Sequence, residues 1–154
     1  MSNIEQSIDV MVPVRTAYDQ WTQFEEFPQF MEGVERIEQI DDTTTRWTTK
    51  VAGRQKEFTA EITEQTPDQR IAWNTVDAPE HAGVVTFHKI DDGHTRVMLQ
   101  MDVEPDGIVE KAGDALGLLE SRVKGDLERF KQFIEARGVE TGAWRGEVEQ
   151  DPTS

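Results

Sequence analysis

The sequence predicts an α+β domain in which an antiparallel sheet is covered on one face by a long C-terminal helix. Two observations carry this prediction. Apolar and polar residues alternate in several short segments separated by turn residues, which is typical of half-buried strands. From residue 108 to 137 the apolar spacing changes to steps of three and four, which predicts one amphipathic helix. Strands that follow one another through tight turns favour antiparallel pairing.

The first strand is expected at residues 3–11, and Pro13 suits the start of a following helix. Aromatic residues then gather in YDQWTQFEEFPQFM, residues 18–31. Pro28 prevents one unbroken helix here, because proline lacks a backbone donor and pushes the preceding residue out of the helical region. We therefore expect two short helical pieces with a bend. The aromatic residues are Tyr18, Trp21, Phe24, Phe27 and Phe30.

Six further strands are expected, at residues 34–40, 45–53, 56–65, 70–76, 84–90 and 94–104. Residues 66–69, TPDQ, form a turn with proline in its favoured second position, and residues 77–83, DAPEHAG, form a loop that contains His81. Asp106 suits the N-cap of the long helix and Gly138 its end.

The hairpin after residue 90 decides which way His88 points. A two-residue turn at 92–93 would place His88 opposite Val97 and on the inner face. A three-residue loop at 91–93 with a glycine bulge would place Phe87 opposite Val97 and His88 outside. Because it pairs apolar with apolar residues, the bulged form is favoured.

Composition excludes several classes of site. The chain has no cysteine, and its three histidines lack ligand spacing, so we expect no disulfide, no metal site and no cofactor. A net charge of −15 makes nucleic acid a poor partner, since phosphate binding needs a basic surface. No apolar run approaches the ~20 residues of a transmembrane helix, and no secretory signal is evident, so we expect a cytoplasmic protein.

Three segments resemble the polyketide cyclase/dehydrase family of the START-like (SRPBCC) superfamily: VPVRTAYDQWTQFEEFPQFMEGV, GVVTFHKIDDGHTRV, and DLERFKQFIEARG. The resemblance covers about residues 3–137 and implies the helix-grip fold, a curved antiparallel sheet wrapped around the long helix, with two short helices after the first strand. We expect one domain at 1–138 and a polar tail at 139–154. Superfamily members bind lipids, sterols, quinones, polyketides or hormones, and only some are enzymes.

The favoured function is binding of a hydrophobic small molecule, such as a lipid, quinone or polyketide-like compound, between the sheet and the long helix. Apolar residues on inward faces, with a few polar groups among them, are typical of such sites. The predicted ligand-binding residues are Phe27, Phe30, Trp47, Thr49, Phe58, Trp73, Phe87, Leu99, Met101, Leu116, Leu119 and Val123. The bulky tryptophans leave open whether this space is a cavity or a filled core.

Two alternatives remain. A cyclase or dehydrase would need a titratable group in a dry pocket, and His88 or Glu64 would have to point inward. Glu64 has inward parity, although a bulge near its strand end would turn it outward. A module for protein interaction would have a filled core and use the acidic surface or Trp144 of the tail. No convincing catalytic residue emerges, so the sequence does not decide whether the protein is an enzyme.

Overall fold

The computed structural model describes residues 2–51, 54–76, 81–103, 112–146 and 148. Its strands are β1 (Ser2–Val10), β2 (Val34–Gln39), β3 (Thr44–Val51), β4 (Arg54–Thr66), β5 (Arg70–Thr75), β6 (His81–Asp91) and β7 (His94–Val103). Its helices are α1 (Val14–Trp21), the short 3₁₀ helix η1 (Phe24–Gln29) and α2 (Ala112–Arg137). This order confirms the predicted α+β class.

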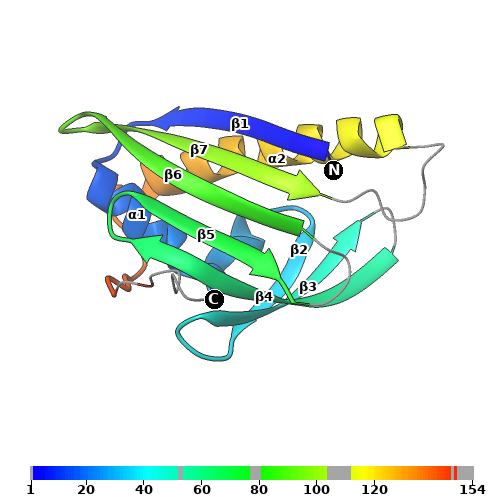
Figure 1. Ribbon diagram of the computed structural model, residues 1–154. Helices are drawn as coiled ribbons and strands as arrows, with labels where there is room; N and C mark the ends of the chain where they lie inside the picture. The colour runs from blue at the N-terminus through cyan, green and yellow to red at the C-terminus, as the bar shows by residue number, and fades with distance from the viewer. Residues whose placement is uncertain (1, 52–53, 77–80, 104–111, 147, 149–154) are drawn as a thin grey trace.

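The seven strands form one curved antiparallel sheet in the order β1-β7-β6-β5-β4-β3-β2 (Figure 1). Only β1 is placed out of sequence, beside the last strand. The long helix α2 lies against one face of the sheet, as the helix-grip fold requires (Figure 1). Within the described ranges, no helix has the length and apolar character needed to cross a membrane.

The end of α2 is as predicted, because Gly138 adopts a φ of +74° and its N–H donates to the carbonyl of Ile134 at 2.8 Å. The predicted N-cap, Asp106, lies outside the described residues.

The two predicted short helices are α1 and η1, and the bend between them falls at residues 22–23 rather than at Pro28, which lies inside η1. A 3₁₀ helix has three residues per turn, so side chains three apart project from the same side. The ring centroids of Phe24 and Phe27 are accordingly 5.3 Å apart, and Phe27 is 5.5 Å from Phe30. The 3₁₀ geometry therefore explains the aromatic spacing of three.

The β6–β7 hairpin has the register that was favoured for it. Phe87 pairs with Val97, and His88 is exposed opposite Arg96. The predicted loop was wrong in detail: residues 92–93 form a two-residue turn, and the extra residue is Ile90 within β6. A bulge in the strand thus has the same effect on side-chain direction as the expected bulge in the loop.

A second bulge lies in β4, where Ile62 pairs with Trp73 but Glu64 pairs with Ala72, so that Thr63 is the extra residue. The bulge turns Glu64 to the outer face, where its carboxylate lies 3.1 Å from Nε of Arg70. One residue later, Gln65 takes the inner face and is buried. Both titratable candidates of the sequence analysis, His88 and Glu64, therefore point away from the inner face.

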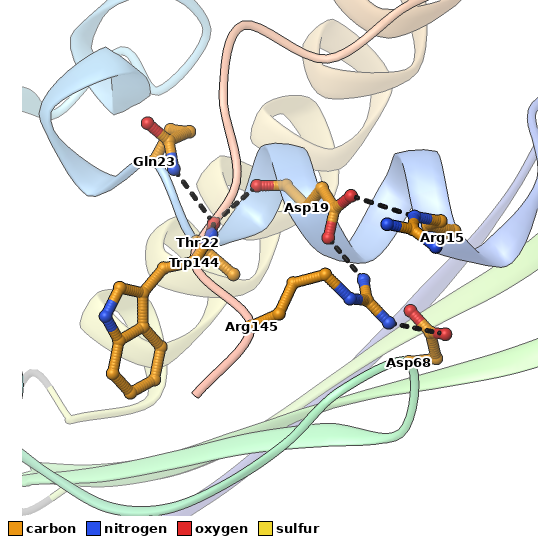
Figure 2. A network of polar contacts seen from close by, with 7 residues as sticks. All are labelled: Arg15, Asp19, Thr22, Gln23, Asp68, Trp144 and Arg145. Carbon is orange, nitrogen blue, oxygen red and sulfur yellow. Dashed lines mark hydrogen bonds and ion pairs between the residues drawn. The ribbon is translucent and has the colours of Figure 1, made fainter. Parts of the chain in front are cut away.

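The C-terminal segment, residues 139–146 and 148, returns to the domain beside β4. Gln65 and Val148 exchange two backbone hydrogen bonds, of 2.7 and 2.9 Å, at a point that β3 does not reach. The segment therefore covers an edge of β4 that would otherwise expose unpaired backbone groups. The N–H of Trp144 also donates to Oγ1 of Thr22 at 3.0 Å (Figure 2).

Figure 2 shows the guanidinium of Arg145 between two carboxylates. Its Nη1 lies 2.5 Å from Oδ1 of Asp19, and its Nη2 lies 2.9 Å from Oδ2 of Asp68. The side chain of Asp19 is only 2 % exposed. Burial raises the pKa of Asp19, and the hydrogen bond from Arg145 opposes that rise. The segment thus supplies the countercharge for a buried carboxylate on α1.

Replacement of Arg145 by methionine is expected to lower the free energy of unfolding by about 3 kcal/mol, because it leaves the buried carboxylate of Asp19 with only the exposed and more distant Arg15 as a charged partner. Urea denaturation measures the change. Arg15→Met is the control, since Arg15 is 68 % exposed and lies 3.7 Å from the same carboxylate. It should cost less than ~0.5 kcal/mol. If both variants lost the same free energy of unfolding, Arg145 would not be the main partner of the buried Asp19 carboxylate.

Candidate functional site

The inner face of the sheet has a sealed region, beneath α1, η1 and the second half of α2. Trp21 is 4.8 Å from Phe130 of α2, measured between ring centroids, and Tyr18 is 5.4 Å from Phe87 of β6. Both pairs meet edge to face, which is the favoured geometry for aromatic rings. The sealed region consists of buried side chains, among them Tyr18, Trp21, Phe24, Phe27, Phe30, Phe87, Val97, Leu127, Phe130 and Ile134.

Beside it lies a second region of the same face, which we call the open region. It consists of Trp47 on β3, Trp73 on β5 and Met101 on β7, three large apolar side chains that pack against the core yet remain partly exposed. Each of them faces inward, because the residue opposite it on a neighbouring strand is buried. These partners are Ile37 for Trp47, Ile62 for Trp73 and Ile4 for Met101. Apolar surface that faces inward and stays accessible is what a hydrophobic ligand would cover.

Phe58 and His81 adjoin the open region. The ring of Phe58 stacks on Trp47 with a centroid distance of 5.7 Å and an interplanar angle of 15°. His81 meets Phe58 edge to face, at 4.9 Å and 84°. The expectation that His81 lies in a loop was wrong, because residues 81–83 are the first residues of β6. The strand begins three residues before its predicted start, because its pairing with β7 extends to His81, which lies opposite Val103.

Gly83 makes room for Trp73, its partner on β5. A Cβ atom at residue 83 would lie 2.5 Å from Cζ2 of the indole and 3.0 Å from the carbonyl oxygen of Gln100. The indole therefore lies directly over the glycine. This contact holds Trp73 along the sheet surface and fixes one wall of the open region.

The other predicted site residues fall in different places. Phe27, Phe30, Phe87, Leu99 and Val123 are buried. Of these, Phe27 approaches the open region, since its ring centroid is 5.9 Å from that of Trp47. Thr49 is partly exposed, and its hydroxyl donates to the carbonyl of Lys56 at 3.4 Å. Leu116 and Leu119 belong to α2, but their side chains lie outside the described part of the chain.

Among the described residues, His81 is the titratable group beside this region. Burial lowers the pKa of His81 below its ordinary value of 6.5, so the imidazole is neutral at pH 7. In the described ranges, no three histidine, aspartate or glutamate side chains come together as metal ligands. The arrangement offers apolar and aromatic contact with one neutral polar group.

Sequence reasoning missed His81 and the pair formed by Asp19 and Arg145. The only available signal for His81 was the strand pattern after it, which extends backwards through Gly83. Asp19 gave no signal, because it lies on a helix and its partner is 126 residues away.

The family described as polyketide cyclase / dehydrase and lipid transport matches residues 10–132. An uncharacterized 17.2 kDa protein of the melC2-rnhH intergenic region in Streptomyces lincolnensis is 66 % identical over 149 residues, covering 96 % of this chain and 99 % of its own.

Solved structures share the fold at low identity. The protein TTHA0849 from Thermus thermophilus has a TM-score of 0.78 at 18 % identity, covering 88 % of this chain and 99 % of its own. The Zhui aromatase/cyclase from Streptomyces sp. R1128 has a TM-score of 0.76 at 15 % identity, covering 93 % of this chain and 99 % of its own. The START-like fold predicted from the sequence is therefore confirmed.

Gly83→Ala is expected to lower the free energy of unfolding by roughly 1–3 kcal/mol, because the added methyl group overlaps the indole of Trp73 and a backbone oxygen. Denaturant unfolding measures the loss. Gly93→Ala is the control, since the nearest atom to a Cβ there is 3.9 Å away. A Gly83→Ala variant as stable as Gly93→Ala would show that the indole does not occupy this position.

The stability that depends on His81 is expected to decrease in mild acid. Above pH 6.5 the imidazole is neutral in both the folded and the unfolded chain. As the pH falls through 6.5, the unfolded chain takes up the proton first, so the free energy of unfolding decreases until the folded group is protonated too. Unfolding of the wild type and His81→Phe between pH 7.5 and 5 isolates this effect from the acidic residues. A difference between the two proteins that does not change with pH would contradict it.

Proposed function

Since the chain belongs to the polyketide cyclase/dehydrase and lipid transport family, we propose that it binds a hydrophobic small molecule in the open region, between the sheet and α2. The family and the START-like fold support a ligand-binding or cyclase role for the chain. The residues assigned to contact with the ligand are those of the open region with Phe58 and, at its border, Phe27. The remaining predicted residues would support them from the core or from α2.

One observation carries this proposal. Trp47, Trp73 and Met101 face inward and pack against the core, but they are not covered as the neighbouring inward residues are. Burying apolar surface stabilises a complex by about 25 cal/mol per Å² before the entropic costs of binding. Two tryptophans offer more of this surface than any other pair of side chains would, so their partial exposure favours a ligand-binding role.

Binding is favoured over proton-transfer chemistry because the carboxylate and imidazole that a cyclase was expected to use point outward. Glu64 is tied to Arg70, and His88 lies within hydrogen-bonding distance of Thr86, with 2.9 Å between Nε2 and Oγ1. Neither reaches the inner face. His81 remains as a neutral polar group at the border of the open region.

Native mass spectrometry of gently purified protein tests the proposal. A reproducible added mass of a few hundred daltons, on the scale of one hydrophobic ligand, is expected. Denaturing release would then give its chemical class. An unchanged mass, also after incubation with lipid and quinone mixtures, would contradict the proposal.

Trp47→Ala is expected to weaken binding of the released ligand roughly thirtyfold, because truncating a central aromatic contact typically costs ~2 kcal/mol. Trp144→Ala is the matched control, since this half-buried tryptophan belongs to the C-terminal segment beside Thr22. Calorimetric titration of both variants measures the affinities, and thermal unfolding verifies that each is folded. Equal affinities would place the ligand elsewhere.

A further inference from the structure

The surface beneath the C-terminal segment is polar, and we call it the docking surface. It is formed by the end of α1, the end of β4 and the turn that follows β4. Each of its members makes at least one hydrogen bond to the segment, and all but the last are buried. They are Asp19, Gln20, Thr22, Gln65 and Asp68.

Most of these hydrogen bonds reach the backbone of the segment. Oε1 of Gln20 accepts from the N–H of Thr141 at 2.8 Å, and Oγ1 of Thr22 accepts from the N–H of Trp144 at 3.0 Å. The backbone of β4 adds two bonds to the end of the segment. Every residue except proline offers such groups. These contacts therefore suit a non-helical peptide chain of almost any sequence, as in recognition by strand addition.

One side chain of the segment is recognised by its chemistry. Figure 2 shows the guanidinium of Arg145 reaching both carboxylates of the docking surface, those of Asp19 and Asp68. A planar guanidinium can serve two acceptors in fixed directions, which the compact ammonium of a lysine does less well. Oδ1 of Asp68 is buried and has no hydrogen-bond partner in the described parts of the chain, so the surface can accept further hydrogen bonds.

The segment does not match the charge of the docking surface. Two carboxylates face one guanidinium, and the second positive charge nearby belongs to Arg15, which is 68 % exposed. Burial raises the pKa of Asp19, Arg145 lowers it, and Glu140 of the segment raises it again. The segment thus brings a like charge to the carboxylate that its arginine binds. A chain with a basic residue in place of Glu140 would fit better.

We infer that the docking surface binds a basic, arginine-containing segment of a partner protein, and that the C-terminal segment is a resident occupant which such a partner displaces. Among the described residues of the C-terminal segment, none is fully buried. Few of its side chains therefore have to leave a packed core. The net charge of −15 attracts a basic partner from a distance. This interaction surface is separate from the open region and does not depend on the proposed function.

Fluorescence anisotropy of a labelled peptide tests the inference. The peptide has the sequence of residues 139–148 with Glu140→Lys, and a control peptide carries Arg145→Met in addition. Both are titrated with three full-length proteins: the wild type, Arg145→Met and Glu140→Lys. The segment of each protein competes with the peptide as an intramolecular ligand. Thermal unfolding verifies that each protein is folded, and Glu140→Lys provides a comparison in which Arg145 is retained.

The lysine-containing peptide is expected to bind Arg145→Met at least roughly tenfold more tightly than the wild type, because the resident segment of that variant competes less. It should bind the Glu140→Lys protein more weakly than the wild type, because the resident segment then fits better. The control peptide should bind Arg145→Met roughly tenfold more weakly, since it lacks the hydrogen bonds to charged groups. Equal affinities of the three proteins, equal affinities of the two peptides, or no binding to any protein would overturn the inference.

A second pair of variants separates recognition from general attraction between charges. In the Arg145→Met background, Asp68→Asn is expected to weaken peptide binding roughly tenfold, because it removes one of the two carboxylates that bind the arginine. Asp92→Asn is the matched control, since it removes the same charge from a side chain that is 100 % exposed in the β6–β7 turn. It should change the affinity less than about twofold. Equal losses would show that the peptide is held by the overall charge alone, and the inference would be wrong.

Discussion

The composition of the inner face depends on two extra residues, Thr63 in β4 and Ile90 in β6. Side chains alternate strictly along a strand, so one added residue exchanges the inward and outward sets beyond it. The bulge at Ile90 keeps Phe87 inside and His88 outside. The bulge at Thr63 keeps Ile62 inside and moves Glu64 to the surface. Both bulges keep a polar side chain, His88 or Glu64, off the apolar face, and so preserve a surface that an uncharged ligand can share.

The sealed region supports the open region through direct ring contacts. Phe27 belongs to the aromatic group of η1 and also touches Trp47, so the first wall of the open region is supported by the closed core. Gly83 supports the second wall by letting Trp73 lie close to the sheet. His81, at the border of the open region, is oriented through Phe58 and Thr75. Trp47, Trp73 and His81 are therefore each supported by a neighbour in the protein.

The fold was predictable because its signals are local. Strand alternation, the helical stripe and the turn residues each depend on a few neighbouring positions. The site was predictable only in part. The inward direction of Trp47, Trp73 and Met101 followed from strand parity, but the extent of their exposure depends on distant elements. The direction of Glu64 was left open because nothing in the sequence around Thr63 marks a bulge. His81 was placed in a loop because proline and glycine surround it, and only pairing with β7 shows that the strand starts there.

Some contacts that complete this fold join residues far apart in the sequence, and this affects when the fold can form during synthesis. β1 pairs with β7, and Asp19 meets a guanidinium 126 residues later. Such pairings are slow to form because a long loop must close before they stabilise anything. A growing chain therefore carries an unpaired first strand until β7 has left the ribosome, and the carboxylate of Asp19 lacks its guanidinium partner until residue 145 has emerged. Until α2 has formed as well, the aromatic residues of α1 and η1 lack their final cover.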